Sequence, residues 1–192
     1  MKAQSSLPEG YREYYSVDLK RNKKQAVLVN LLSVLIGAAV IAPMCFVIPI
    51  STLFDLSDGL LIYCLRFGAL IISMIAYIVL HELTHGLAMK MCGTSRVKYG
   101  FSVLYAYAGS DDYYSRGAYI FIALAPIVLF GVLLSAVCAM VPISWFWVAY
   151  IVQAVNLSGA AGDLYVTFRF IGFPKDILIR DSGYSMVVYS RG

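Results

Sequence analysis

Long apolar segments dominate the hydrophobic pattern of this 192-residue chain. A helix needs about 20 apolar residues to cross the ~30 Å hydrocarbon core of a bilayer. Four segments are long enough, at 26–50, 60–80, 118–141 and 145–171, and the helical pattern of the second continues to about residue 92. The pattern therefore predicts an all-α membrane protein, with four transmembrane helices in a single domain, 1–192.

Prolines modify two of the predicted spans. Pro43 lies inside the first segment and Pro49 near its end, so we expect a kink or an early stop there, because proline cannot donate a helical hydrogen bond. Pro126 lies inside the third segment. A membrane helix tolerates such a proline when neighbouring groups bond to the carbonyl that it frees.

Basic residues divide unevenly among the connections. They precede the first apolar segment, separate the second from the third and follow the fourth, whereas 52–59 and 142–144 contain none. The positive-inside rule therefore predicts that both termini and the long middle loop are cytoplasmic. Arg66, inside the second segment, is the exception, and we expect it to snorkel to the outer interface or to line a polar cavity. The residues that set this orientation are Lys20, Arg21, Lys23, Lys24, Lys90, Arg96, Lys98, Arg116, Arg169, Lys175, Arg180 and Arg191.

The polar connections have the character of strands. Segment 97–105 is rich in β-branched and aromatic residues, and 11–19 and 177–189 are similar, the last with an interruption at 181–183. Residues 109–112, Gly-Ser-Asp-Asp, are typical of a turn. We therefore expect a small β element on the cytoplasmic face.

Composition agrees with a membrane location. Hydrophobic residues make up 60% of the chain and charged residues 14%, and the mean hydropathy is +0.76. Soluble domains are nearer half apolar and a quarter charged. The net charge of +4 follows from the orienting residues and indicates no nucleic-acid partner. The polar residues 1–24 do not resemble a signal peptide, so the first apolar segment is expected to be a retained anchor.

A metal-binding motif, HELTH, occupies positions 81–85 at the inner end of the second span. Residues i and i+4 share a helix face, so His81 and His85 can direct two imidazoles at one ion. In the metalloprotease arrangement the two histidines hold Zn²⁺, and the intervening glutamate, here Glu82, accepts a proton from the attacking water.

The alternative is a chance match, or two histidines satisfied inside a helix bundle. These are the only two histidines in the chain, and Glu82 is one of three glutamates, so chance is a poor explanation. Ionisable groups at membrane depth are costly and are functional by default. The pattern therefore favours a metal site.

A catalytic zinc site requires a third protein ligand and an open fourth position. No third histidine exists and no glutamate follows Glu82, which leaves the aspartates. At about 1.5 Å per residue, His81 lies about 30 Å along the second span and Asp163 about 28 Å along the fourth, so both reach a similar depth. We therefore predict Asp163 as the third ligand, with an interfacial cap or a partner for Arg169 as its structural alternative. The other candidates are Asp111, Asp112, Asp176 and Asp181.

Asn156 lies about two helical turns before Asp163, on the same face. Its amide could donate to a substrate backbone or to the oxyanion, or it could tie one helix to another. The small residues at 158–162 would let another backbone approach closely, from the second span or from a substrate strand.

These residues resemble the site-2 protease family of intramembrane zinc proteases. After HELTH, a glycine and the segment 97–101 follow in an order similar to that family's glycine and strand region. Asn156 to Asp163 looks like a shortened form of its second motif, in which an asparagine precedes the aspartate ligand by about two turns. The proline of that motif is missing, and Leu164 stands where the family has a glycine.

A second resemblance spans most of the chain. It is to small prokaryotic membrane proteins of unknown function labelled as zincin peptidases, which implies a zincin in a prokaryotic cell membrane and supplies no substrate. The similar segments are 7–11, 81–86, 99–101, 125–126 and 162–163.

The sequence thus predicts a zinc-dependent intramembrane endopeptidase. Its partners would be the lipid bilayer and a membrane-inserted protein or peptide, cleaved near the cytoplasmic side. Two other classes stay open: a catalytically silent metal-binding scaffold, which would need the ligands and not Glu82, and a metal or proton transporter. A transporter would need polar residues continuing to the outer face, and few occur beyond Arg66. The sequence does not indicate an oligomeric state.

Overall fold

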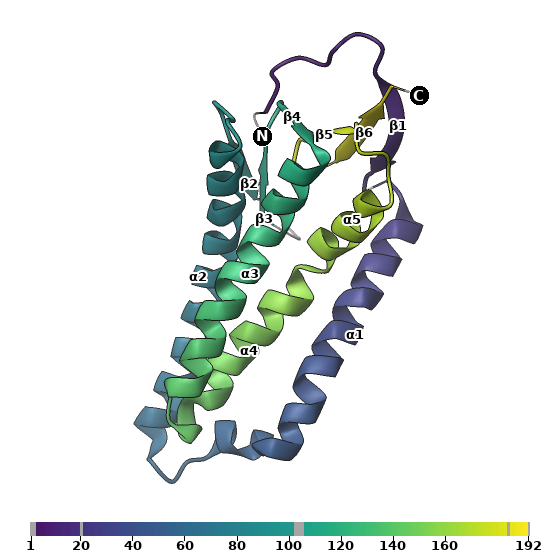
Figure 1. Ribbon diagram of the computed structural model, residues 1–192. Coiled ribbons are helices and arrows are strands. Elements are labelled where there is room, and N and C mark those ends of the chain that lie inside the picture. Colours follow the sequence, from purple (N-terminus) through teal and green to yellow (C-terminus); the bar gives the residue numbers. More distant parts are fainter. Residues whose placement is uncertain (1–2, 20, 102–105, 184, 192) are drawn as a thin grey trace. The chain divides into compact units, whose positions relative to one another are not determined.

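The computed structural model describes the chain except residues 1–2, 20, 102–105, 184 and 192 (Figure 1). The residues form two compact units, each built from separated pieces of chain. The first contains Met1–Val29, Leu80–Pro126 and Gly162–Gly192. The second contains Asn30–Val79 and Ile127–Ala161. The single-domain organisation expected from the sequence stays a prediction.

Within the described residues, three helices are long and apolar enough to cross a membrane. They are α1 (Lys23–Val47), α2 (Leu60–Met91) and α3 (Arg116–Met140). They correspond to the first three predicted spans, and α2 continues past HELTH to within one residue of the predicted end. The predicted early stop in the first span is also present: α1 ends at Val47, and the short 3₁₀ helix η1 (Ile50–Phe54) follows Pro49.

The fourth predicted span is not one helix. It divides into α4 (Ile143–Gly159) and α5 (Ala161–Ile171), with Ala160 outside both. At Ala160 the backbone has φ −82° and ψ 16°, and its N–H donates to the carbonyl of Ser158, two residues back. Gly159 and Gly162 flank this point, and glycine is a poor helix former because it loses the most backbone entropy. The prediction of a continuous helix over 145–171 is therefore wrong at Ala160.

The predicted β element is confirmed as two small sheets in the first unit. Four antiparallel strands lie in the order β1-β6-β5-β4 and a separate hairpin pairs β2 with β3. The N-terminal strand thus pairs with the C-terminal one, Arg12 opposite Ser190. Residues 102–105 of the predicted strand 97–105 lie outside the described residues. The strands are β1 (Arg12–Val17), β2 (Lys98–Phe101), β3 (Ala106–Gly109), β4 (Tyr113–Ser115), β5 (Leu178–Asp181) and β6 (Met186–Ser190).

An apolar core holds the sheet of the first unit against its helices. Tyr114 of β4, Ile179 of β5 and Val188 of β6 are fully buried, and they pack with Ile122 of α3 and Phe170 of α5. Burial of each large apolar side chain contributes about 1.5–3 kcal/mol, so this cluster fixes where α3 and α5 lie against the sheet.

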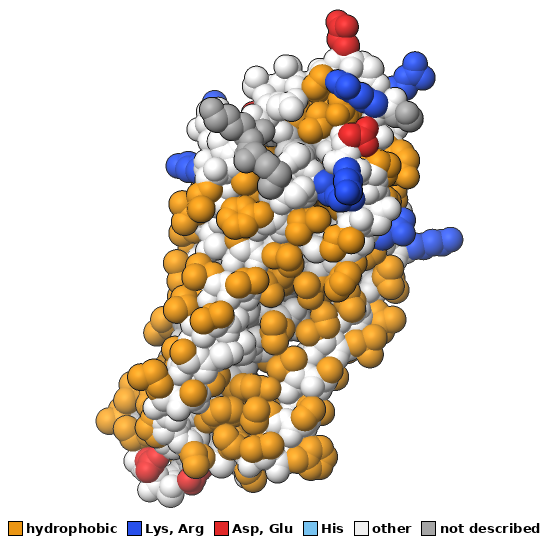
Figure 2. All heavy atoms as spheres, viewed as in Figure 1, with side chains coloured by type: hydrophobic (Ala, Val, Ile, Leu, Met, Phe, Trp, Pro, Cys, Tyr) orange, Lys and Arg blue, Asp and Glu red, His pale blue; other side chains and the backbone are white. Residues whose placement is uncertain are grey.

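The helix surfaces carry an unusual number of exposed hydrophobic side chains. Phe46 is 92% exposed, Leu61 72%, Ile72 69% and Val132 67%, and Figure 2 shows such side chains covering the helices. Water-soluble monomers rarely expose apolar patches of this extent, whereas lipid tails solvate them. Among the described residues, every Lys and Arg except Arg66 belongs to the first unit. These features are compatible with a membrane protein.

Arg66 lies in the second unit and is fully buried. Its guanidinium donates to the carbonyl of Asp55, at 2.9 Å, and forms an ion pair with Asp58. Both partners lie in the connection between α1 and α2, so Arg66 holds this connection at the start of α2.

Candidate metal centre

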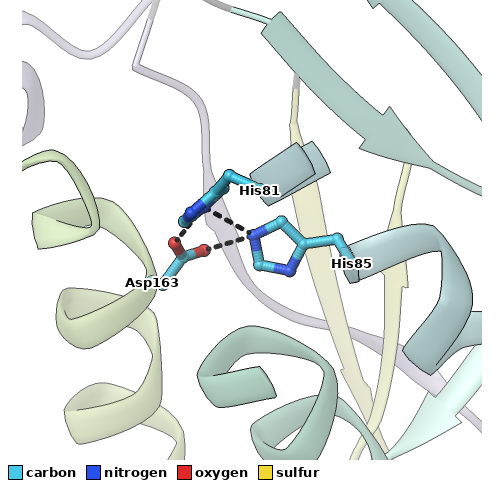
Figure 3. A group of neighbouring side chains, drawn as sticks. All are labelled: His81, His85 and Asp163. Carbon is cyan, nitrogen blue, oxygen red and sulfur yellow. Dashed lines mark hydrogen bonds and ion pairs between the residues drawn. The ribbon is translucent and has the colours of Figure 1, made fainter. Parts of the chain in front are cut away.

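Two histidines and an aspartate of the first unit form a compact cluster (Figure 3). The Nε2 atoms of His81 and His85 lie 3.1 Å apart. Asp163 directs one carboxylate oxygen at each ring, at 3.5 Å from His81 Nε2 and 3.6 Å from His85 Nε2. Within the described part of the chain, no other group of three His, Cys, Asp or Glu residues brings its ligand atoms so close.

Two helices place these side chains. His81 and His85 are one turn apart in the last third of α2, so they project from the same face. Asp163 occupies the first turn of α5, directly after the break at Ala160. The amino end of a helix carries a partial positive charge, which favours a carboxylate there. The break therefore gives Asp163 a helix terminus that an unbroken helix would lack.

A backbone hydrogen bond orients the second histidine. The Nδ1 atom of His85 lies 2.9 Å from the carbonyl oxygen of Ile122 in α3. A carbonyl can only accept, so His85 carries its proton on Nδ1. The lone pair of the neutral ring is then on Nε2, the atom that faces His81 and Asp163. Metal-binding histidines usually donate their other ring N–H to such a group.

The donor set fits zinc. Two imidazoles and one carboxylate are the protein ligands of one common catalytic zinc site, with bonds of about 2.0–2.2 Å. In a tetrahedron of such bonds the ligand atoms are about 3.3–3.5 Å apart. The two Nε2 atoms are 3.1 Å apart, and the contacts of 3.5 and 3.6 Å involve different oxygens of Asp163. With one oxygen as the ligand, the three ligand atoms lie within 4.8 Å of one another, so the side chains are grouped closely enough to share one ion. The same contacts would also satisfy the three side chains as ion pairs, which is the structural alternative.

Glu82 lies beside the cluster and is not one of its members. It follows His81 in α2 and is partly buried. It interacts electrostatically with both histidines and with Asp163, and the backbone of Ala108 in β3 lies close to its carboxylate. A carboxylate near two imidazoles and a second carboxylate can accept a proton there, and the general-base role expected for Glu82 stays a prediction.

The β2–β3 hairpin lies against α2 beside the motif. The ring of Tyr99 in β2 occupies the space where a Cβ on Gly86 would be. Lys98 pairs with Asp111, which Arg180 of β5 also contacts at 3.0 Å. The hydrogen bond from Lys98 lowers the pKa of the exposed Asp111 carboxyl. These contacts fix the hairpin to both α2 and the four-stranded sheet.

The other aspartates proposed as the third ligand have different positions. Asp111 is exposed in the ion pairs just described, and Asp112 and Asp176 are outside the cluster. Asp181 is buried in β5, where it accepts hydrogen bonds from the Tyr119 hydroxyl, at 2.6 Å, and the Gly183 N–H, at 2.8 Å. Burial raises the pKa of the Asp181 carboxyl. Asp163 alone of the five meets the histidines.

Asn156 lies in the second unit, fully buried in α4. Its amide oxygen accepts a hydrogen bond from the Tyr77 hydroxyl at 3.1 Å. Its NH₂ group donates to the Ile127 carbonyl and to Gln153 Oε1, each at 3.4 Å. These bonds tie α4 to α2 and α3, the alternative expected from its sequence position. The oxyanion role of Asn156 stays a prediction.

The fold and the cluster define a class: a helical, membrane-compatible protein with an HELTH motif and a nearby aspartate. Residues 74–178 match the model of a family described as "Putative zincin peptidase". The match covers more than half of the chain and includes all three cluster residues, and the chain belongs to this family. Comparisons with curated proteins and with solved structures found no match.

Proposed function

We propose that this protein is a zinc-dependent intramembrane endopeptidase. The observation that carries the proposal is the division between His81, His85 and Asp163, which converge, and Glu82, which lies next to them outside the group. A scaffold needs only the convergent ligands. A hydrolase also needs a base at that place, and membership of the zincin peptidase family supports the same function.

Each side chain has one task in the proposed reaction. His81 Nε2, His85 Nε2 and an Asp163 oxygen would hold Zn²⁺, which supplies Lewis-acid activation of the water and of the scissile carbonyl. Glu82 accepts a proton from the attacking water as the C–O bond forms. It then delivers that proton to the amide nitrogen as the C–N bond breaks, which releases an amine and a carboxylic acid. The acid gives its proton to the released amine, so the products are an ammonium and a carboxylate.

The substrate would be a membrane-inserted segment. A helical segment hides its backbone carbonyls in its own hydrogen bonds, so cleavage requires local unwinding. The β2–β3 hairpin is the proposed binding site for an unwound substrate segment. It has only two strands, it lies against α2 at Gly86, and Ala108 of β3 is close to Glu82. A strand added to this hairpin would be held by main-chain hydrogen bonds.

The proposed topology keeps both termini and the hairpin in the cytoplasm of a prokaryotic cell. Both termini on one side require an even number of crossings, and α1, α2 and α3 supply three. The fourth would be α4, whose 17 residues reach about 25 Å and equal the lower limit for a spanning helix. The basic residues of the first unit support this orientation.

Cleavage and metal content test the proposal together. Wild-type protein and Glu82→Gln are reconstituted in liposomes with a single-span model substrate, and zinc is measured in both. We expect equal zinc and cleavage by the wild type alone. Zinc with no cleavage by either protein, across a set of single-span substrates, would contradict the endopeptidase proposal and favour the scaffold. Zinc flux into the liposomes would indicate the transporter.

Four further variants test the ligands. His81→Ala, His85→Ala and Asp163→Ala should each weaken zinc binding by more than about 100-fold, because loss of a residue that only hydrogen-bonds to a ligand already weakens metal binding by about 10–100-fold. Asp181→Asn is the matched control: it alters a buried aspartate of the same unit that lies outside the cluster, and it should bind zinc normally. Zinc lost from Asp181→Asn and kept by Asp163→Ala would refute the assignment of Asp163.

A further inference from the structure

We propose that Pro126 is a positioning residue for the metal centre, and that it acts by freeing the Ile122 carbonyl to hold His85. Pro126 binds nothing itself. Its proposed effect passes through one backbone oxygen to the ring of His85. The inference rests on the proposed metal site, and it assigns to that site a residue that is far from every ligand along the chain.

The first step is the helical hydrogen bond that cannot form. In an α-helix the carbonyl of residue i accepts from the N–H of residue i+4, so the partner of Ile122 would be residue 126. Proline has no N–H, and its ring also collides with the carbonyl four residues back and pushes it away from the helix. α3 continues through this position from Arg116 to Met140, so the Ile122 carbonyl lies within a regular helix and still lacks its helical donor.

The second step is the need of that carbonyl for another donor. Ile122 is 2% exposed and Pro126 is less than 2% exposed, so neither has access to solvent. An unsatisfied buried carbonyl costs about 1–3 kcal/mol. The structure satisfies this one with the imidazole of His85, whose Nδ1 lies 2.9 Å from the oxygen. One hydrogen bond therefore removes the cost of the proline and fixes the ring.

The third step is the effect on the metal ligand. With Nδ1 protonated, the lone pair of His85 lies on Nε2, which faces Asp163 and His81. An N–H at position 126 would compete for the Ile122 carbonyl and draw it back toward the axis of α3. The His85 ring would then lose the hydrogen bond that fixes its orientation before any ion binds. Zinc affinity should then fall by about tenfold, at the lower end of the range for such supporting groups.

Two substitutions at position 126 isolate the N–H. Pro126→Ala introduces it. An ester variant, with lactic acid incorporated at position 126, has the same methyl group and no N–H. Pro43→Ala is the matched control, because Pro43 is also inside a long apolar helix, α1, and lies in the other unit. All are full-length chains in detergent micelles, with zinc affinity measured by competition against a chelator.

The hydrogen bond from His85 is measured without metal, through the ¹H and ¹⁵N shifts of its Nδ1–H. The chain has only two histidines, so His81→Gln assigns the spectrum. We expect a hydrogen-bonded Nδ1–H in the wild type and the ester variant, and a weakened bond with about tenfold weaker zinc binding in Pro126→Ala. Normal affinity and an unchanged Nδ1–H signal in Pro126→Ala would overturn the proposal. So would equal losses in Pro126→Ala and the ester variant, or in Pro126→Ala and Pro43→Ala, since these would indicate general helix damage. A wild type that binds no zinc, with the Nδ1–H signals as expected, would refute the zinc site and not the role of Pro126.

Discussion

The contact between Gly86 and Tyr99 predicts that Gly86→Ala destabilises the wild-type protein but stabilises a variant that lacks the Tyr99 ring. A Cβ added to Gly86 would lie 2.6 Å from Cζ and 2.8 Å from Cε1 of the Tyr99 ring. Alanine at position 86 therefore displaces the ring, and overpacking of this kind costs about 1–3 kcal/mol. Against this, alanine stabilises a helix interior by about 0.5–1 kcal/mol relative to glycine. Gly86→Ala should thus destabilise the wild type by about 1 kcal/mol.

Removing the ring should leave only the favourable effect. In a Tyr99→Ala background, we expect Gly86→Ala to stabilise the protein by about 0.5–1 kcal/mol, which gives a coupling free energy of at least about 1.5 kcal/mol between the two positions. Gly68→Ala is the control, because Gly68 also lies in α2 and its added Cβ meets no atom within 4 Å. It should stabilise both backgrounds equally.

Unfolding in mixed detergent micelles measures the change in unfolding free energy that Gly86→Ala and Gly68→Ala each cause, with and without Tyr99→Ala. The cleavage assay is then run on the same variants. A shift of 1 kcal/mol corresponds to about 2–4 °C in Tm for a chain of this size. Because Tyr99 belongs to the β2–β3 hairpin, Gly86→Ala should also slow cleavage while zinc stays bound. If Gly86→Ala has the same effect on stability with and without the Tyr99 ring, the ring does not oppose a side chain at position 86.

Three other predictions concern orientation, substrate and pH. A cysteine at the exposed Ser95, in a cysteine-free background, should be labelled only from the cytoplasmic side and one at Ser57 only from outside; labelling of Ser95 from outside would refute the topology. Gly or Pro near the cut of a single-span substrate should speed cleavage and Leu should slow it, whereas equal rates for inserted and water-soluble peptides would indicate an ordinary membrane-anchored peptidase. The pKa of Asp111 is lowered in the fold, so its ion pairs stabilise the hairpin above the unfolded value of about 3.9 and are lost as pH falls through the folded value. The protection factors of the β2 amides, which are corrected for the intrinsic pH dependence of exchange, should therefore fall only in acid, and should be lower at every pH in Asp111→Asn; protection that does not fall in acid would contradict the role of these ion pairs.

Hydrophobic length and the motif spacing were sufficient for much of the architecture. The bounds of α2 follow because a long apolar run continues without interruption into HELTH. Asp163 could be singled out by depth because a helical rise is constant and the other aspartates lie in polar connections. Strands β1, β2, β5 and β6 were also indicated, since their residues have local β propensity, whereas β3 and β4 lie outside the predicted segments.

Other features had no local signal. The residues at 158–162 are small and uncharged, so hydropathy does not mark an end there, and the break at Ala160 depends on backbone geometry. The pairing of β1 with β6 joins opposite ends of the chain, and no short pattern encodes it. The acceptor for His85 is a backbone carbonyl, which every residue has. Pro126 was the available signal, because it marks Ile122 as the residue whose carbonyl lacks a helical donor.

The interruption at Ala160 also determines whether a change in the length of α4 would turn Asp163. In a continuous helix, inserting one residue rotates everything after it by about 100°, which would turn Asp163 away from the histidines. Here α4 ends at Gly159 and α5 begins at Ala161, so the ladder of hydrogen bonds does not run from one to the other. The place of Asp163 in the first turn of α5 is therefore set by where α5 begins, and not by the number of residues in α4.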